Sequence, residues 1–113
     1  MTFNVDGEMT FGEYQNEALK TLQPDADRLY PAVKVGIEGS EYAQHVVKNV
    51  YHGKPLSIEF LIDEAGDVLW YLAVSLAQHG ITLGSVAELN IAKLRKRHGE
   101  SYNPDFYQGN GAE

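Results

Sequence analysis

Residues 58–79, IEFLIDEAGDVLWYLAVSLAQH, decide the fold class of this chain of 113 residues. The segment lacks proline, and its apolar residues recur three and four positions apart, which is typical of an α-helix. At about 100° per residue, one set of apolar side chains falls within an arc about 120° wide. We expect this arc to be the core face, and it consists of Ile58, Leu61, Ile62, Ala65, Val68, Leu69, Leu72 and Leu76.

A second stripe on the same segment combines two acids with apolar residues. Phe60, Glu64, Asp67, Tyr71 and Val74 fall within an arc of roughly 80° on the far side of the helix. A solvated charged face would not usually have apolar residues above and below its acids. We therefore expect the helix to bury both sides, with the two carboxylates at a solvated edge, and ordinary surface acids are the alternative.

Capping and breaking residues predict a helix before this segment and a second one before that. Thr10 and Glu13 form a capping box for a helix from about residue 11 to residue 22, which ends before a proline. Asp25 and Asp27 can cap the next helix, which tolerates Pro31 only in its first turn. That helix is expected to run to residue 51 or 52, because a glycine and then a proline follow.

A fourth helix follows the segment and runs to about His98. It begins near Thr82 or Ser85, and the capping box of Ser85 with Glu88 favours the later start. Residues 99–113 are rich in glycine, asparagine and proline, and we expect them to form a loose C-terminal tail. No strand alternation, repeat or linker is present, so the fold class is an all-α, four-helix, bundle-like domain.

Composition agrees with one globular domain over residues 1–113, with a core at about 9–98. Sixteen acidic residues oppose nine basic ones, which argues against binding to a nucleic-acid polymer. The absence of cysteine excludes disulfides, thiolate zinc sites and cysteine nucleophiles. The N-terminal residues do not resemble a signal peptide and no apolar run is long enough to span a membrane, so we expect a cytoplasmic protein.

The second helix has a continuous polar stripe that includes another pair of acids three residues apart. Glu38 and Glu41 repel each other unless a cation neutralises them. Lysine and histidine side chains on the stripe can do so, which would make it a solvated, salt-bridged face. The alternative is binding of a hard cation, magnesium or manganese, by carboxylate oxygens. The stripe consists of Lys34, Glu38, Glu41, His45, Lys48 and His52.

A short connector, residues 53–56, forces the second and third helices to run antiparallel. Glu41 lies 12 residues before Gly53 and Glu64 lies 11 residues after it, so the two acidic pairs should lie at similar heights. The sequence therefore predicts that antiparallel helices form one metal site with four carboxylates, those of Glu38, Glu41, Glu64 and Asp67.

The spacing of these acids resembles a known signature. Glu38-x-x-Glu41, then 22 residues, then Glu64-x-x-Asp67 resembles the MazG-like all-α nucleoside triphosphate pyrophosphohydrolases, in particular their short single-domain members. The segments MTFGEYQ, DEAGDVLWYLA and NIAKL, with an arginine shortly after the last, are similar to the same family. Ser40 departs from the family pattern, which often has glycine there.

The resemblance implies magnesium-dependent hydrolysis of a nucleoside triphosphate to the monophosphate and pyrophosphate. Such a reaction would remove unwanted nucleotides from the cellular pool. The four acids would hold Mg²⁺, with Mn²⁺ also possible, to clamp the phosphates and activate a water. Glu41 or Glu38 would also accept a proton, and the sequence does not choose between them. Further substrate contacts are expected from Lys48, Asn90, Lys93, Arg97, Trp70 and Tyr71.

These substrate contacts have simpler alternatives: solvated lysines, an amide in a cap, and aromatic rings in a core or subunit interface. The third helix is apolar around most of its circumference, which a monomer of this size cannot cover. We therefore expect a homodimer or a larger homo-oligomer. Two other functions stay open, namely a non-catalytic acidic helical metal-binding or interaction module and a phosphoribosyl-ATP pyrophosphatase-like relative.

Overall fold

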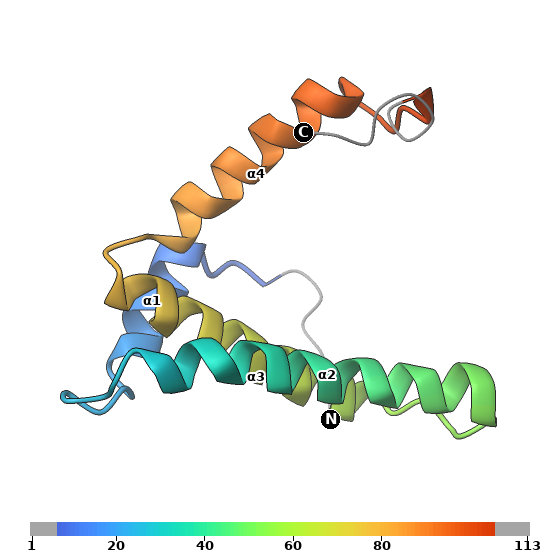
Figure 1. The fold of residues 1–113 in the computed structure, drawn as a ribbon, viewed down its shortest axis with the longest axis horizontal. Coiled ribbons are helices and arrows are strands. Elements are labelled where there is room, and N and C mark those ends of the chain that lie inside the picture. The colour runs from blue at the N-terminus through green and yellow to red at the C-terminus, as the bar shows by residue number, and fades with distance from the viewer. Residues whose placement is uncertain (1–6, 106–113) are drawn as a thin grey trace.

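The computed structural model describes residues 7–105, which form four α-helices and no strand (Figure 1). The expected all-α fold with four helices is therefore confirmed. None of the helices in this range has the length and apolar content needed to cross a membrane. The helices are α1 (Phe11–Leu19), α2 (Leu29–His52), α3 (Ile58–Gln78) and α4 (Leu83–His98).

The start of α1 is capped as expected, but its end is earlier than expected. Thr10 Oγ1 accepts from the Glu13 N–H at 3.0 Å, and the Thr10 N–H donates to Glu13 Oε1 at 2.8 Å. The helix ends at Leu19 instead of residue 22, because the following residues form tighter bonds three positions back. One of these joins the Leu22 N–H to the Leu19 carbonyl at 3.2 Å.

The C-terminal end of α2 and the start of α3 agree with their sequence signals, whereas the N-cap residue of α2 is Arg28 and Asp27 acts from one position before it. Asp27 Oδ1 accepts from two N–H groups at the start of α2, and Pro31 lies in the first turn. Gly53 ends α2 with φ 65°, in the left-handed region that glycine favours. Ser57 caps α3 by accepting from the Phe60 N–H at 3.1 Å.

The preference for Ser85 as the cap of the fourth helix was wrong. Thr82 is the cap, and its Oγ1 accepts from the Ser85 N–H at 3.2 Å. Ser85 lies inside α4, where its hydroxyl donates to the Thr82 carbonyl at 2.9 Å. Both residues can cap a helix, and the earlier one does so here.

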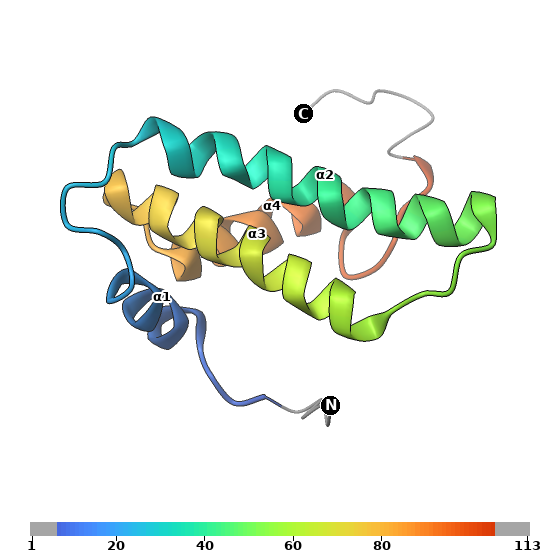
Figure 2. The ribbon, with the colours of Figure 1, turned by 90° about the horizontal axis from the view of Figure 1, so that it is seen from below.

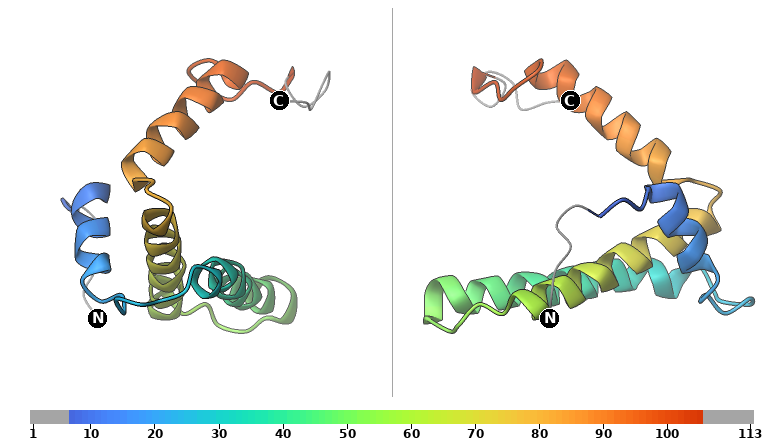
Figure 3. Two further views of the ribbon diagram at one scale, coloured as in Figure 1. Left: turned by 60° about the vertical axis from the view of Figure 1, so that its left-hand side comes forward. Right: turned by 180° about the vertical axis from the view of Figure 1, so that it is seen from behind.

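Helices α2 and α3 form an antiparallel hairpin, and they lie side by side along most of their length (Figure 2). Helix α1 packs against the C-terminal half of α3. Helix α4 leaves this end of the hairpin and projects away from it, with α1 as its main neighbour (Figures 1 and 3). The layer that positions the site is therefore the α2–α3 hairpin.

The face of α3 that the sequence assigned to the core is not buried in this chain. None of its eight residues is buried, and Ile58 and Ile62 are 45% and 44% exposed. The buried residues of α3 are Glu64, Ala73 and Val74. The hairpin turns the acidic stripe of α3 toward α2, so the expected core face lacks a cover within residues 7–105.

A buried glutamine connects three parts of the fold. Gln15 of α1 is 5% exposed, and its Nε2 donates to the carbonyls of Ala73 at 2.9 Å and Ile81 at 3.2 Å. Its Oε1 accepts from the Leu83 N–H at 3.0 Å. Gln15 thus fixes α1 to the end of α3 and to the turn from which α4 starts.

The described part of the C-terminal tail folds back on the end of α4. The Tyr102 ring stacks on His98 at 5.7 Å between centroids, and the Asn103 N–H donates to His98 Nδ1 at 3.1 Å. Residues 106–113, which the sequence also assigned to a loose tail, lie outside the described residues.

Candidate metal centre

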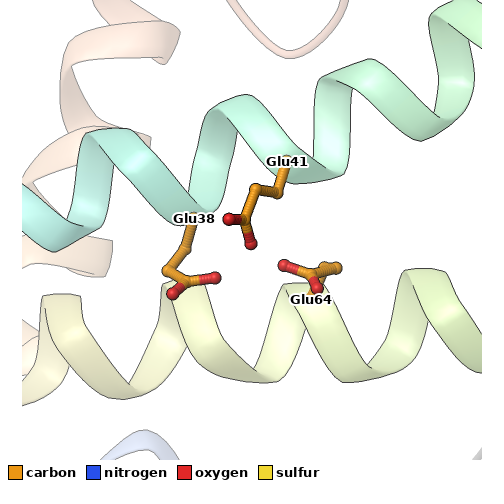
Figure 4. A group of neighbouring side chains, drawn as sticks. All are labelled: Glu38, Glu41 and Glu64. Carbon is orange, nitrogen blue, oxygen red and sulfur yellow. The ribbon is translucent and has the colours of Figure 1, made fainter.

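Three of the four predicted carboxylates meet between α2 and α3. Glu38 and Glu41 come from α2 and Glu64 comes from α3, and their side chains point toward one another (Figure 4). One carboxylate oxygen of each lies within 4.8 Å of the others. We call these residues the carboxylate cluster. The antiparallel hairpin and the similar heights of the pairs bring these three together, whereas the fourth predicted acid, Asp67, is not part of this group.

Glu64 is the most perturbed acid of the cluster. It is 7% exposed, and its Oε2 is buried without a hydrogen-bond partner among the described residues. Burial, together with the neighbouring Glu38 and Glu41, raises the pKa of Glu64 to about 7. A buried oxygen without a partner is costly, so this position suits a ligand that supplies positive charge.

Glu38 already has a cationic partner. Lys34, one turn earlier on α2, places its Nζ 3.1 Å from Glu38 Oε1. The hydrogen bond from Lys34 lowers the pKa of Glu38, and the same bond raises the pKa of Lys34. Glu38 is therefore ionised when Glu64 is still partly protonated. The sequence analysis named Lys34 only as a member of the polar stripe. Its ion pair with Glu38 makes it a neighbour of the carboxylate cluster.

The fourth predicted acid belongs to a second group on α3. Carboxylate oxygens of Asp63, Glu64 and Asp67 lie within 4.8 Å of one another, so Glu64 belongs to both groups. Burial raises the pKa of Asp67, and the charge of Asp63 adds to the effect. The sequence analysis missed Asp63. Its signal was the spacing of four between Asp63 and Asp67, which places them one turn apart.

A cavity of about 290 Å³ opens beside the carboxylate cluster. Glu41, Glu64 and Lys48 line it, together with His45 and Phe60. His45 Nε2 accepts from the N–H of Ser57, the cap of α3, at 2.9 Å, and its ring lies 4.6 Å from that of Phe60. Because Lys48 lines the same cavity as Glu41 and Glu64, it lies near the carboxylates. Its expected contact with a phosphate remains a prediction.

A second cavity, of about 300 Å³, lies at the other end of the hairpin. We call it the aromatic pocket, because Tyr30, Trp70 and Tyr71 line it. The Trp70 Nε1–H donates to Thr21 Oγ1 at 2.8 Å, and the rings of Trp70 and Tyr71 meet edge to face at 5.1 Å. Trp70 and Tyr71 are thus held as walls of a pocket, and they do not line the cavity beside the carboxylates.

The remaining predicted contacts lie on α4. Asn90, Lys93 and Arg97 are three and four residues apart, so they share one face of this helix. None of the three lines the cavity beside the carboxylate cluster. Because α4 projects away from the hairpin, the chain does not bring these residues to its own carboxylates (Figure 3). Their role in substrate binding remains a prediction.

The donor set fits a hard divalent cation. Among the described residues it consists of carboxylate oxygens, which Mg²⁺ and Mn²⁺ prefer, and it includes the buried Oε2 of Glu64, which has no hydrogen-bond partner there. Two groups have such donors, Glu38 with Glu41 and Glu64, and Asp63 with Glu64 and Asp67. That the four predicted acids hold one metal ion together remains a prediction.

Comparison with known families identifies the class of protein. Residues 38–101, more than half of the chain, match the MazG nucleotide pyrophosphohydrolase domain. This stretch contains every acid of both carboxylate groups. The chain therefore belongs to the MazG nucleotide pyrophosphohydrolase domain family, which agrees with the resemblance seen in the sequence. In the same comparisons, the chain matched no curated protein and no solved structure.

Proposed function

We propose that this protein is a magnesium-dependent nucleoside triphosphate pyrophosphohydrolase that removes nucleotides from the pool. Water adds to the α-phosphorus, the bond from that phosphorus to the oxygen leading to the β-phosphorus breaks, and the monophosphate and pyrophosphate leave. The observation that supports this best is the carboxylate cluster inside a MazG domain, with a buried carboxylate oxygen that has no hydrogen-bond partner in the described part of the chain.

Glu38, Glu41, Glu64 and Asp67 would hold Mg²⁺, and Mn²⁺ has the same preference for oxygen ligands. The bound ion supplies Lewis acidity to the phosphate oxygens and lowers the pKa of a water. Glu41 suits the role of proton acceptor better than Glu38, because Glu41 lines the cavity of about 290 Å³ beside the cluster and Glu38 does not.

The aromatic pocket is the proposed place for the nucleobase. Trp70 and Tyr71 offer flat rings there, and Lys34 lies between this pocket and the carboxylate cluster. Lys48 lines the cavity on the other side of the cluster, where it can donate to a phosphate oxygen. A triphosphate would then extend from the pocket toward the cluster.

We also propose that the active form is a homodimer or a larger homo-oligomer. The Cα radius of gyration is 17.0 Å, whereas a compact domain of this length has about 13 Å. A third cavity, of about 340 Å³, exposes apolar side chains of α2 and α3, among them Tyr42, Leu69 and Leu72. A second copy can cover these faces.

The charge of the chain favours a second copy as that cover. Four of the nine Lys and Arg residues lie in the last six residues of α4, whereas the hairpin holds the acids of the site. A copy that lays its α4 along the hairpin of its partner would bring Asn90, Lys93 and Arg97 toward the partner's carboxylates. The proposed site therefore combines α2 and α3 of one protomer with α4 of the other.

One experiment tests the proposed reaction. The protein is incubated with each ribo- and deoxyribonucleoside triphosphate plus Mg²⁺, and with phosphoribosyl-ATP, and the products are identified. We expect a monophosphate and pyrophosphate, and no turnover after chelation of the metal. Diphosphate plus orthophosphate would reject the assignment, and turnover of phosphoribosyl-ATP alone would move the protein to that relative. No turnover with any nucleotide would favour a non-catalytic metal-binding module.

A further inference from the structure

Lys34 contacts both the aromatic pocket and the carboxylate cluster. Its Nζ lies 5.8 Å from the centroid of the Tyr30 ring and 5.6 Å from that of Tyr71. The same ammonium lies 3.1 Å from Glu38 Oε1. Tyr30 and Tyr71 line the aromatic pocket, while Glu38 belongs to the cluster. One cation therefore lies on the path between the two parts of the site.

The contact is largely withdrawn from water. The side chains of Lys34 and Glu38 are 21% and 10% exposed, so solvent screens their attraction less than on an open surface. The two tyrosine rings, which meet edge to face at 6.1 Å, add a favourable electrostatic surface for the ammonium. Lys34 is thus held in place by three partners from two helices.

A cation in this position has to compete with a metal ion. In the metal-free chain, Lys34 neutralises one carboxylate of the three, while Glu64 Oε2 has no hydrogen-bond partner within residues 7–105. Once Glu38 ligates a divalent cation, its attraction for Lys34 weakens and the ammonium is repelled by the ion. The tyrosine rings still attract it, and its flexible stem lets it turn to another nearby anion.

We propose that Lys34 is a substrate-binding residue that exchanges Glu38 for a phosphate oxygen of the nucleotide when metal and substrate bind. This inference rests on the proposed function, because it assumes a nucleotide whose base occupies the aromatic pocket. Lys34 then has two measurable effects of opposite sign. It weakens metal binding in the absence of nucleotide, and it strengthens binding of the nucleotide.

The test replaces Lys34 with methionine, which keeps most of the stem and removes the charge. We expect Lys34→Met to bind Mg²⁺ several-fold more tightly than the wild type when no nucleotide is present, because a competing cation is gone. We expect its kcat/KM for the nucleotide to fall by about 10- to 100-fold, mainly through KM, because a hydrogen bond from a charged donor is lost. Calorimetric titration and initial rates measure the two effects.

A matched control removes the same charge elsewhere. Lys54→Met changes an exposed lysine in the connector between α2 and α3 and should alter neither quantity by more than about twofold. Lys34→Gln is the second neutral variant, and it replaces Lys34→Met if the latter does not fold. A variant that binds Mg²⁺ more weakly, or one that keeps the wild-type kcat/KM, would overturn the role of Lys34.

The outcomes separate this inference from the function on which it rests. Wild-type protein that turns over no nucleotide rejects the proposed function. Wild-type turnover with a neutral variant of unchanged kcat/KM rejects the role of Lys34 alone. Wild-type turnover with tighter metal binding and a higher KM in the variant supports both.

Discussion

At the scale of single residues, burial controls the protonation of Glu64. The raised pKa, about 7, means that the folded metal-free chain binds a proton more tightly than the unfolded chain between about pH 4.5 and 7. The contribution of Glu64 to folding stability is therefore complete below its ordinary pKa of 4.5, and it is lost as the pH rises through its pKa of about 7 in the folded chain. Asp67, whose pKa is also raised, acts in the same direction.

The first prediction is that Glu64→Gln removes this pH dependence and the activity together. Without metal, the wild-type melting temperature should fall between pH 5 and pH 8, whereas that of the variant should fall less. At pH 8 the variant should be the more stable protein, because a neutral amide no longer repels the neighbouring carboxylates. Its turnover should be more than about 100-fold lower. Melting curves and product assays measure both.

The control for this variant is Glu59→Gln, which makes the same change at an exposed position in the first turn of α3. It should keep the wild-type pH dependence and turnover. If Glu64→Gln is instead less stable than the wild type in metal-free buffer at pH 8, Glu64 is a structural acid and its assignment as a metal ligand is wrong.

The second prediction tests whether Glu41 and Asp67 serve one metal site. A tenfold rise in free Mg²⁺ should stabilise the wild type by about 1.4 kcal/mol once the concentration exceeds the dissociation constant. Glu41→Gln or Asp67→Asn should sharply weaken that response, and the double variant should weaken it little further, because the two residues act through the shared Glu64. Melting temperature against Mg²⁺ concentration gives the response. Additive losses in binding free energy would indicate two separate acidic patches.

The sequence predicted some residues of the site better than others, for physical reasons. Pairs three residues apart on antiparallel helices have nearly fixed positions, so Glu38, Glu41 and Glu64 were predictable as neighbours. Asp63 was missed because a step of about 100° turns it off the stripe of Glu64. The contact of Lys34 with the Tyr71 ring depends on how the side chains of α2 and α3 pack against each other, and spacing along one helix does not give it.

At the scale of helices, caps and stops were predictable because they depend on a few neighbouring residues. Thr10, Asp27, Gly53 and Ser57 all act as their residue types suggested. The predicted start of α4 was wrong because Thr82 and Ser85 can each cap a helix. The turn after α3 decides which of the two does so. Gln15 fixes that turn, and the sequence did not indicate this role.

The third prediction concerns this glutamine. Gln15→Leu should destabilise the chain by about 3 kcal/mol, because three hydrogen bonds are lost and the Leu83 N–H is left buried without its partner. Urea denaturation measures the loss. Gln23→Leu, which removes an exposed bond to Asp25, is the control and should cost less than about 0.5 kcal/mol. Equal losses in the two variants would contradict the role of Gln15 in joining α1 to α3 and α4.

At the scale of the whole molecule, the sequence did not reveal which side of each helix faces its partner. Helix α3 has apolar residues on two sides, and the choice depends on whether the second helix or a second copy covers a given side. The structure assigns the acidic side to the hairpin interior and leaves Ile58, Ile62 and Ala65 outside. That arrangement leads to the last prediction.

The last prediction is that two impaired variants restore activity when they share an oligomer. Lys93→Ala, which removes a proposed phosphate contact on α4, should lower kcat/KM by at least about tenfold. If α4 serves the partner's carboxylates, a mixed dimer of Lys93→Ala with Glu64→Gln contains one complete site. Random pairing makes half of the dimers mixed, so the mixture should regain about a quarter of the wild-type activity.

The control is a mixture of Glu41→Gln with Glu64→Gln. Both substitutions affect the carboxylates of their own protomer, so every site contains one substituted carboxylate and activity should not return. Co-expression with two affinity tags isolates the mixed species for rate measurements. A mixed dimer of Lys93→Ala with Glu64→Gln that is no more active than its parents would mean that α4 does not act across the interface. Full activity of Lys93→Ala alone would remove Lys93 from the site.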